Sequence, residues 1–600
     1  MKSRVLAFSK EDLLLLRQAF EQPGDPTVWR SFVGNCEPLA VNLSAAEQAK
    51  AFDLQPILPG SLVTDVQVER IRFQAEEALQ ALQEEYAQVP GKTRNWVRED
   101  AYRLRVVLQE IFSAIAVGTG LLKTGRRNIL SLTRTMSPDL CKKNPAYIPT
   151  RIWQGMFPDS AQSLAILAES VIPPYPPQGT PVEKAPKGAL VFAFIAFELF
   201  RHLPMLQQTA REAKRPVVVC LFDILSDGTS YANAEKILSG AGITFLRVPS
   251  RLHTNIDVPS KCFLAESAVR HIPFAESLSD YWGMLEHWRW EELEAQLRWW
   301  ETALPILEPS GVVVTCDNLV PEALLPAEAA RQLGVPTVGI PHAYVVGSIS
   351  HYCAKVQDAS ATGSDFQAKW WHRKHQPLRA GAFMQLQLIN EYPCTRVSTE
   401  KSEKTVLFVH VPAEFPNTFS WVDEPIRKSI SLRELEQKLV EAEADLRILH
   451  KVHPGAPELE IFSLAEVPLE RILPADSEFA AAVSGVLASV SYNYFGSPFI
   501  QSMRHHRPAI LFFTGTYGRA FSVETRGQLE ESGLLVTDKP DALVEWIAML
   551  RHDPAFFRSV VERQDRFYAE NFADVRTDWS AWLESTVTEL RGEVKRRRDE

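Results

Sequence analysis

The chain has 600 residues, too many for a single hydrophobic core, so we expect two or more lobes. Hydrophobic residues make up 46% and charged residues 23%, an ordinary globular composition that excludes disorder over most of the length. The formal net charge is −10, from 64 Lys and Arg against 74 Asp and Glu. This balance argues against broad nucleic-acid binding, because such binding needs a positive field.

The spacing of the cysteines and the sequence of residues 1–15 predict where in the cell the protein is located. The seven cysteines are scattered and never spaced Cys-x-x-Cys, which fits neither a disulfide scaffold nor a structural zinc site. Residues 1–15 lack the basic start and apolar run of a secretory signal. The apolar stretch 106–122 contains Gln109 and Glu110 and is short for a bilayer span. We expect a cytoplasmic protein with at most peripheral membrane contact through the basic run 595–598.

Residues 1–185 are expected to form a mainly helical region, which is either a unit of its own or a part of the first lobe. Apolar residues recur at helical spacing through 11–21, 66–88 and 100–122. The run 39–43 is a candidate short strand of the first lobe. We interpret the proline-rich segment 172–177 as a stiff extended connector.

Two α/β lobes are predicted over 186–395 and 396–575, with a polar linker at 392–404 and a helical tail at 576–600. Their strands are nearly continuous hydrophobic runs, as in parallel sheets covered on both faces. The expected strands are 190–197, 216–222, 243–248, 312–315, 337–340 and 359–362 in the first lobe, and 405–411, 446–452, 486–490, 509–513 and 534–536 in the second. The main expected helices are 231–238, 281–307, 322–333, 432–443, 498–505, 541–550 and 554–570.

The strand 446–452 ends abruptly in His453-Pro454-Gly455. Lys451 and His453 are two residues apart, so a strand places both on one face, with His453 at the carboxyl end. Open α/β sheets bind ligands outside the carboxyl ends of their strands. A cationic pair there suits a nucleotide phosphate, although a strand that ends in a solvated turn would explain the isolated motif.

Four loops of the second lobe should open at the same edge of its sheet. They are 412–417, 453–455, 491–498 and 514–519. In the third loop Ser497 is a natural N-cap and Pro498 suits the first helical position, so the helix start is a candidate anion site. Gln501 lies one turn along and could reach sugar hydroxyls, while Arg519 in the fourth loop is a phosphate candidate. An ordinary capped helix remains the alternative for the third loop.

This assembly resembles the GT-B class of nucleotide-sugar glycosyltransferases, and within it bacterial enzymes of capsule, lipopolysaccharide, sialyl- or Kdo-transfer type. In that class a strand ending in Lys-x-His-Pro precedes a Ser-Thr-x-x-x-Glu-Ala element. Residues 451–454 match the first motif, and 497–502 match the second loosely. Gln501 stands where an acid often contacts the donor ribose, so the resemblance leaves the nucleotide open. The likeness spans roughly residues 188–575.

The first lobe carries two further likenesses to this class. Ile340-Pro341-His342-Ala343 resembles the family's Gly-Ile-Pro strand that runs into Gln-His-Gly, which implies that His342 faces the cleft. Ser226-Asp227-Gly228 resembles the acidic loop of GT-B sialyltransferases, whose acid serves as base. Only one acid precedes the glycine here, and Asp-Gly is also a common turn pair.

Catalysis by such an enzyme needs a base for the acceptor hydroxyl and positive groups for the departing phosphate. Asp227, Asp317 and Glu322 are candidate bases, since each is expected on a loop that follows a first-lobe strand. The absence of an Asp-x-Asp triplet favours a reaction without a metal or other cofactor.

The leading hypothesis is an inverting glycosyltransferase that uses a nucleotide-activated sugar. A CMP-linked ulosonic acid is the favoured donor and a UDP-sugar the second, with a glycan, lipid-linked or protein acceptor. The alternatives are a polyol-phosphate transferase or a sugar-nucleotide epimerase on the same frame, or a non-catalytic nucleotide-binding scaffold.

Overall fold

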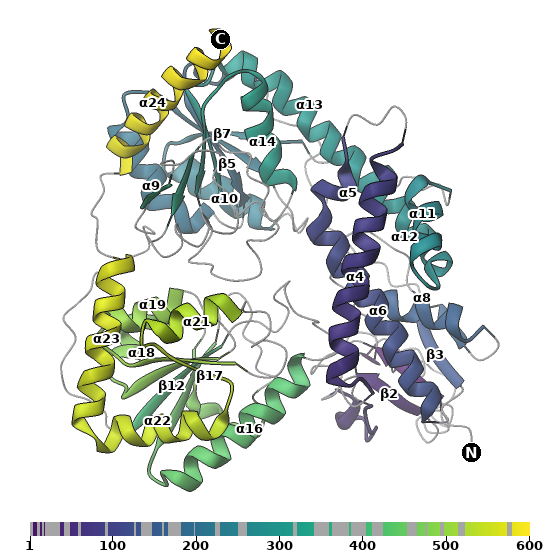
Figure 1. The fold of residues 1–600 in the computed structure, drawn as a ribbon. Helices are drawn as coiled ribbons and strands as arrows, with labels where there is room; N and C mark the ends of the chain where they lie inside the picture. The colour runs from purple at the N-terminus through teal and green to yellow at the C-terminus, as the bar shows by residue number, and fades with distance from the viewer. Residues whose placement is uncertain are drawn as a thin grey trace.

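The structure is a computed structural model, and Figure 1 shows its fold. It describes residues 4–8, 13–14, 17, 36–40, 48–57, 62–89, 94–124, 128–133, 147–158, 161–165, 182–196, 199–222, 229–249, 261–315, 321–340, 359–362, 383–385, 404–410, 424–452, 462, 465–474, 477–492, 497–513, 523–572 and 579–599. Within these residues the strands form three sheets, and every printed strand pairing is parallel.

The N-terminal region contains a four-stranded sheet in the order β2-β1-β3-β4. Its strands are β1 (Arg4–Phe8), β2 (Cys36–Ala40), β3 (Asn128–Thr133) and β4 (Ala161–Ala165), and its main helices are α4 (Asp65–Tyr86), α5 (Trp96–Glu99), α6 (Ala101–Lys123) and α8 (Tyr147–Met156). Helix dominates, as the sequence indicates. The expectation of one strand that belongs to the first lobe is wrong, because β2 pairs with β1 in a separate sheet.

The second sheet has seven strands in the order β11-β10-β9-β8-β5-β6-β7. They are β5 (Leu190–Ile195), β6 (Val217–Phe222), β7 (Thr244–Arg247), β8 (Gly311–Thr315), β9 (Thr337–Ile340), β10 (Ala359–Thr362) and β11 (Phe383–Gln385). The α-helices within this stretch are α9 (Leu199–Glu212), α10 (Thr229–Gly240), α11 (Phe263–His271), α12 (Ser279–Met284), α13 (Trp290–Leu307) and α14 (Pro321–Gln332), with a π-helical turn η5 (Leu285–Arg289) before α13.

The third sheet has six strands in the order β14-β13-β12-β15-β16-β17. They are β12 (Thr405–His410), β13 (Arg447–Lys451), β14 (Ile472–Leu473), β15 (Ala488–Tyr492), β16 (Ala509–Phe512) and β17 (Leu535–Thr537). The helical segments are α16 (Glu424–Ala442), η7 (Leu469–Arg471), α18 (Phe479–Ser484), α19 (Ser497–Arg504), α21 (Val523–Glu531), α22 (Pro540–His552), α23 (Pro554–Phe572) and α24 (Trp579–Asp599).

Both larger sheets are covered on two faces, which confirms the prediction of two doubly wound lobes. Along β5, Val191 packs into one hydrophobic cluster, whereas Phe192 packs into another. Along β12, Phe408 packs into one hydrophobic cluster and Leu407 into another in the same way. The alternation follows from the strand period of two residues. The lobe boundaries at 186, 396 and 576 stay predictions.

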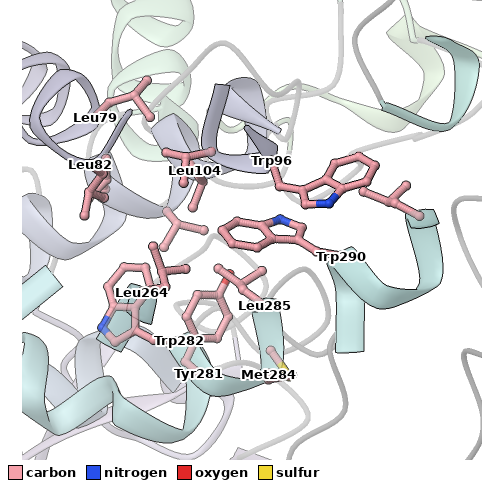
Figure 2. Packing of buried hydrophobic residues seen from close by; sticks show 14 of the residues in the cluster. Leu79, Leu82, Trp96, Leu104, Leu264, Tyr281, Trp282, Met284, Leu285 and Trp290 are labelled. Atoms are coloured by element: carbon pink, nitrogen blue, oxygen red, sulfur yellow. The ribbon is translucent and has the colours of Figure 1, made fainter. Parts of the chain in front are cut away.

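The N-terminal helices and the first lobe share one hydrophobic core (Figure 2). Trp96 of α5 and Trp290 of α13 are almost fully buried in the same cluster as Leu82 of α4. The ring of Tyr86 meets that of Trp290 edge-on, with centroids 5.3 Å apart. A continuous core of this kind shows that the N-terminal helices pack directly against helices of the first lobe.

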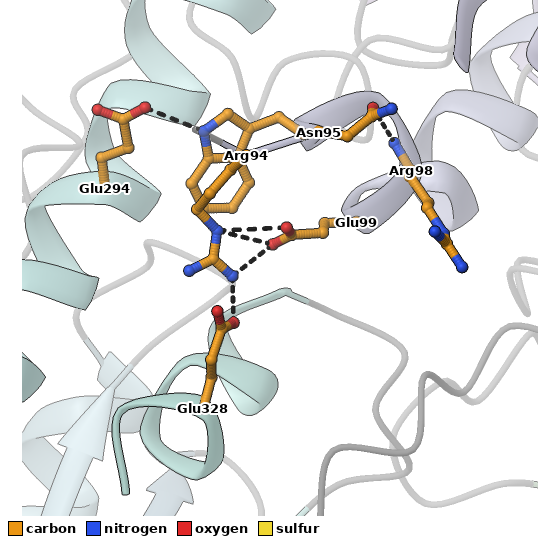
Figure 3. A network of polar contacts seen from close by, with 7 residues as sticks. Arg94, Asn95, Arg98, Glu99, Glu294 and Glu328 are labelled. Carbon is orange, nitrogen blue, oxygen red and sulfur yellow. Dashed lines mark hydrogen bonds and ion pairs between the residues drawn. The ribbon is translucent and has the colours of Figure 1, made fainter. Parts of the chain in front are cut away.

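Polar contacts reinforce this junction at α5 (Figure 3). The Arg94 guanidinium donates to Glu99 at 2.7 Å and also pairs with Glu328 of α14. The indole of Trp96 donates to Glu294 of α13 at 3.1 Å. These bonds tie the short helix α5 to two helices of the first lobe.

The C-terminal helix α24 packs on the first lobe, although the third sheet precedes it in sequence (Figure 1). Trp582, Leu583 and Val587 are buried in the cluster that also holds Phe192 of β5. A side chain at Gly311 of β8 would meet Val587 at 2.9 Å, so the helix lies directly against the sheet. The chain therefore crosses from the second lobe back to the first.

One helix of the described part, Arg103–Lys123, is long and apolar enough to cross a membrane. In the structure this segment of α6 packs against α4 and α8, and 56% of its apolar window is buried within the protein. More than half of this apolar window is thus buried against other parts of the protein.

Candidate functional site

The third sheet defines a candidate ligand site through its strand order. β12 comes first in sequence and lies at the centre, with β13 and β14 on one side and β15, β16 and β17 on the other. The chain adds β13 and β14 on one side of β12 and then returns to add β15 on the other side, so the strand order reverses between β12 and β15. Ligands of doubly wound sheets bind outside the carboxyl ends of the strands at such a switch point. His410 and Tyr492 end these two strands and are direct partners across them.

A buried polar cluster lies at this point and includes His410. Nε2 of His410 is 3.0 Å from Nδ1 of His450 on β13. Nε2 of His450 is 2.8 Å from a carboxylate oxygen of Glu436 on α16, and Arg471 of η7 donates to the other oxygen at 3.2 Å. His450 is fully buried and His410 is 5% exposed. The two imidazoles are thus within hydrogen-bond distance of each other, and the Glu436 carboxylate lies at ion-pair distance from His450 without a hydrogen bond between them.

Aromatic rings enclose the two imidazoles. Phe462 meets His410 edge-on at a centroid distance of 4.9 Å, and its ring lies 5.2 Å from His450. Tyr492 lies 5.4 Å from His410, and Phe408 lies 5.7 Å from His450. An apolar enclosure lowers the local dielectric, which strengthens hydrogen bonds inside it and makes an unmet polar atom costly.

Lys451, a predicted phosphate ligand, is buried at the end of β13. Its ammonium group donates to the carbonyls of Val452 and Pro474, each at 3.2 Å. These bonds hold the amine against the backbone. They give Lys451 a structural role in joining β13 to the segment after β14.

Helix α19 begins at Ser497, where the sequence predicts a capped helix start. Ser502 donates to the carbonyl of Pro498 at 2.8 Å, a bond within the helix. Gln501 is half-buried on the same helix, directly after β15. The positive end of the α19 dipole therefore lies at the sheet edge that carries the switch point.

Glu322, a predicted base of the first lobe, is buried at the start of α14 and forms an ion pair with Arg289. Burial opposes ionisation, but the Arg289 guanidinium outweighs it and holds the pKa of Glu322 below its ordinary value. Nε of Arg289 also lies 3.9 Å from Asp100, whose pKa is raised by burial. A carboxylate so placed is a poor proton acceptor, so we assign Glu322 to the junction with the N-terminal region.

The other predicted site residues lie outside the described residues. They are Asp227, Asp317, His342, His453 and Arg519. Asp227, Asp317 and His342 follow β6, β8 and β9 in sequence, and His453 and Arg519 follow β13 and β16. Their roles stay predictions. In the part of the chain that the structure describes, no group of three His, Cys, Asp or Glu side chains could hold a metal ion.

The sequence analysis missed His410, His450 and Glu436 as members of a site. A signal was present for His410, which ends the mainly apolar and fully buried strand β12, whereas β13 also holds Arg447 and Lys451, so His450 does not stand out in sequence. The sequence gave no signal that Glu436 belongs to the site, since an acidic residue on a predicted helix usually faces solvent. Only the packing of α16 on the sheet brings this acid to His450.

Comparison with known proteins gives no family. No family model matches the sequence, and no curated protein matches it. Among solved structures, a UDP-GlcNAc 2-epimerase from Neisseria meningitidis bound to UDP-GlcNAc is 11% identical, with a TM-score of 0.40 over 67% of this chain and 100% of that one. MurG from Acinetobacter baumannii is 11% identical, with a TM-score of 0.39 over 67% and 100%.

The spinosyn rhamnosyltransferase SpnG is also 11% identical, with a TM-score of 0.37 over 66% of this chain and 99% of that one. Similarity this low does not transfer an activity or a residue role. The fold assignment rests on the sheet topology of this chain itself.

Proposed function

We propose that this protein is a glycosyltransferase that moves a sugar from a nucleotide-activated donor to a glycan, lipid-linked or protein acceptor. The observation that carries the proposal is the switch point of the third sheet, where a buried polar cluster and the start of α19 share one sheet edge. Such a point is the standard place for a nucleotide in a doubly wound sheet. The resemblance of residues 451–454 to the Lys-x-His-Pro motif supports a sugar nucleotide.

The proposed chemistry is a single displacement. A first-lobe base, Asp227 or Asp317, removes the proton from the acceptor hydroxyl, and the resulting oxygen attacks the anomeric carbon. The bond from that carbon to the phosphate oxygen breaks, and the nucleotide leaves with the electron pair. His453, Arg519 and the α19 dipole stabilise the charge on the leaving phosphate. No metal takes part in this scheme.

We further propose a CMP-linked ulosonic acid as donor, with a UDP-sugar as the second choice. Gln501 leaves the donor nucleotide open, because its uncharged amide can bind either a ribose hydroxyl or a sugar hydroxyl. We also propose a cytoplasmic location with at most peripheral membrane contact. The free, buried thiols of Cys220 and Cys262 fit a reducing compartment.

Product analysis tests the proposal. The full chain is incubated with CMP-, UDP- and GDP-sugars and a mixture of glycan and lipid-linked acceptors, and products are identified by mass spectrometry. We expect a new glycosidic bond and a free nucleotide, both abolished in His453→Ala with its unfolding midpoint unchanged. A phosphodiester product, an altered free nucleotide sugar, or full activity of His453→Ala would overturn the proposal.

A further inference from the structure

We propose that a buried water molecule binds where four side chains meet, at the junction between the N-terminal helices and the first lobe. The four residues are Asp100, Arg289, Trp290 and Glu322. The water accepts hydrogen bonds from the guanidinium and the indole, and it donates to the two carboxylates. This site does not depend on the proposed transferase activity, because it needs neither nucleotide nor sugar.

Three helix ends bring the four side chains together. Asp100 precedes the first residue of α6, and Glu322 is the second residue of α14. Arg289 ends η5, and Trp290 begins α13. All four residues are between 1% and 4% exposed. An aspartate at the start of a helix commonly caps it, but Asp100 forms no side-chain cap of α6, so its buried carboxylate serves another purpose.

Direct contacts among the four side chains leave several polar atoms over. Nη1 of Arg289 pairs with Glu322, but Nε of Arg289 lies 3.9 Å from Oδ2 of Asp100, which is too far for a hydrogen bond. Burial raises the pKa of Asp100, and the Trp290 indole is among the groups that lower it, so the indole lies beside this carboxylate. In the part of the chain that the structure describes, five buried atoms of this cluster have no hydrogen-bond partner, namely Oδ2 of Asp100, Nε and Nη2 of Arg289, Nε1 of Trp290 and Oε2 of Glu322.

The chemistry of these five atoms matches a water molecule. They comprise N–H donors and carboxylate acceptors, and water both donates and accepts. Buried waters typically make about three hydrogen bonds to polar groups that have no other partner. The gap between Arg289 and Asp100 is of the length at which a bridging water is expected. An anion would face two carboxylates and a cation would face the guanidinium, so a neutral ligand fits best.

A crystal structure of the full chain, at a resolution that shows ordered waters, tests the site directly. We expect one density peak within hydrogen-bond distance of Nε1 of Trp290, Oδ2 of Asp100 and Nε of Arg289. A map without this peak, or one in which these three groups bond directly to one another, overturns the proposal.

Nuclear Overhauser contacts between indole protons and water test the site in solution. The full chain is labelled with ¹⁵N-tryptophan, and each indole signal is assigned through a phenylalanine substitution at its position. We expect a cross-peak with water for the indole proton of Trp290. Trp153 and Trp282 are matched controls without a cross-peak, because their buried indoles donate to the carbonyls of Ala114 at 2.8 Å and Ala275 at 3.2 Å. No water contact at Trp290, or equal contact at all three, contradicts the site.

A double variant tests which groups hold the water. Glu322→Leu with Arg289→Met removes three of the five atoms and places apolar side chains beside the indole, so the cross-peak of Trp290 with water should disappear. A cross-peak that persists in this variant overturns the assigned partners. If the double variant does not fold, the wild-type map and spectrum still decide whether the water is bound, because neither depends on it.

Discussion

Glu322 shows how burial changes the meaning of an acid. In sequence it follows a first-lobe strand and is a reasonable base, but its carboxylate is buried and paired with Arg289. Lys451 changes in the same way, because its amine donates to two backbone carbonyls. Conversely, His410 ends β12 and His450 lies in β13, and the two buried imidazoles form the polar cluster of the switch point. Residue type and spacing cannot distinguish these cases, since each involves a contact with a residue more than 20 positions away, such as Pro474 for Lys451.

The ion pair of Glu322 supplies a prediction at the residue scale. Glu322→Gln leaves the buried Arg289 with only the more distant Asp100, at 3.9 Å, as an ion-pair partner, so we expect the free energy of unfolding to fall by about 3–5 kcal/mol. The double variant Glu322→Leu with Arg289→Met removes both charges of this pair and should recover part of the loss, although Asp100 then stays buried without Arg289. Urea denaturation measures both. A Glu322→Gln protein of unchanged stability that has lost turnover would instead make Glu322 the base.

At the scale of elements, an ionic contact joins α4 to α11. Arg270 donates to Glu85 at 2.5 Å, Ser267 also donates to it, and His271 lies at 2.8 Å. The hydrogen bond from Arg270, followed by that from Ser267, lowers the pKa of Glu85 from 4.5 to about 2. A depressed carboxyl pKa stabilises the fold above the unfolded value, and this contribution is lost as pH falls toward the folded value.

We therefore predict a change in acid stability when Glu85 is replaced. The difference in unfolding midpoint between wild type and Glu85→Gln should be largest at neutral pH and should shrink as pH falls from about 4.5 to about 2. Thermal unfolding across this range measures it. A difference that does not depend on pH would show that the carboxylate charge is not involved.

The junction between α5 and α13 gives a second prediction at this scale. Trp290 is 2% exposed and contacts Tyr86, so Trp290→Ala should cost about 3–5 kcal/mol of unfolding free energy. Trp299 lies on the same helix but is only half-buried, so Trp299→Ala is the matched control and should cost clearly less. Equal costs in denaturant titrations would contradict a shared core at this junction.

For the whole molecule, helix α24 makes the first lobe depend on the end of the chain. Each fully buried apolar side chain contributes about 1.5–3 kcal/mol, and Trp582, Leu583, Val587 and Leu590 are all buried on this helix. Deleting residues 577–600 should lower the stability of the first lobe by roughly 5 kcal/mol or more. Deleting only 593–600 should have little effect. Hydrogen exchange of β5 reports this lobe, and an unchanged rate in the longer deletion would contradict the packing.

The two doubly wound lobes could be predicted because their strands are strongly apolar. The predicted strand 190–197 is found as β5 at Leu190–Ile195, and the predicted 337–340 agrees with β9. The N-terminal sheet could not be predicted, because β1 and β4 have only five residues each and β4 also holds Gln162 and Ser163. Their pairing with distant β3 is non-local and leaves no pattern in sequence.

The docking of α24 on the first lobe and the contact between His410 and His450 could not be predicted for a related reason. The sequence indicates an apolar helix face or a buried histidine, but it does not identify the partner. In the candidate site, the start of α19 was predicted to within one residue, at 498 against the observed Ser497, because helix-start preferences are local chemistry. The contact of Glu436 with His450 depends on the packing of α16 against the sheet.

Hydrogen–deuterium exchange of the full chain, with and without a saturating nucleotide selected by calorimetry from CMP, UDP and GDP, tests the central claim most directly. The account predicts slower exchange in peptides that cover 405–423 and 488–504, which contain the ends of β12 and β15. Protection confined to the first two sheets, or no binding of any of the three nucleotides, would contradict a nucleotide site at the switch point of the third sheet.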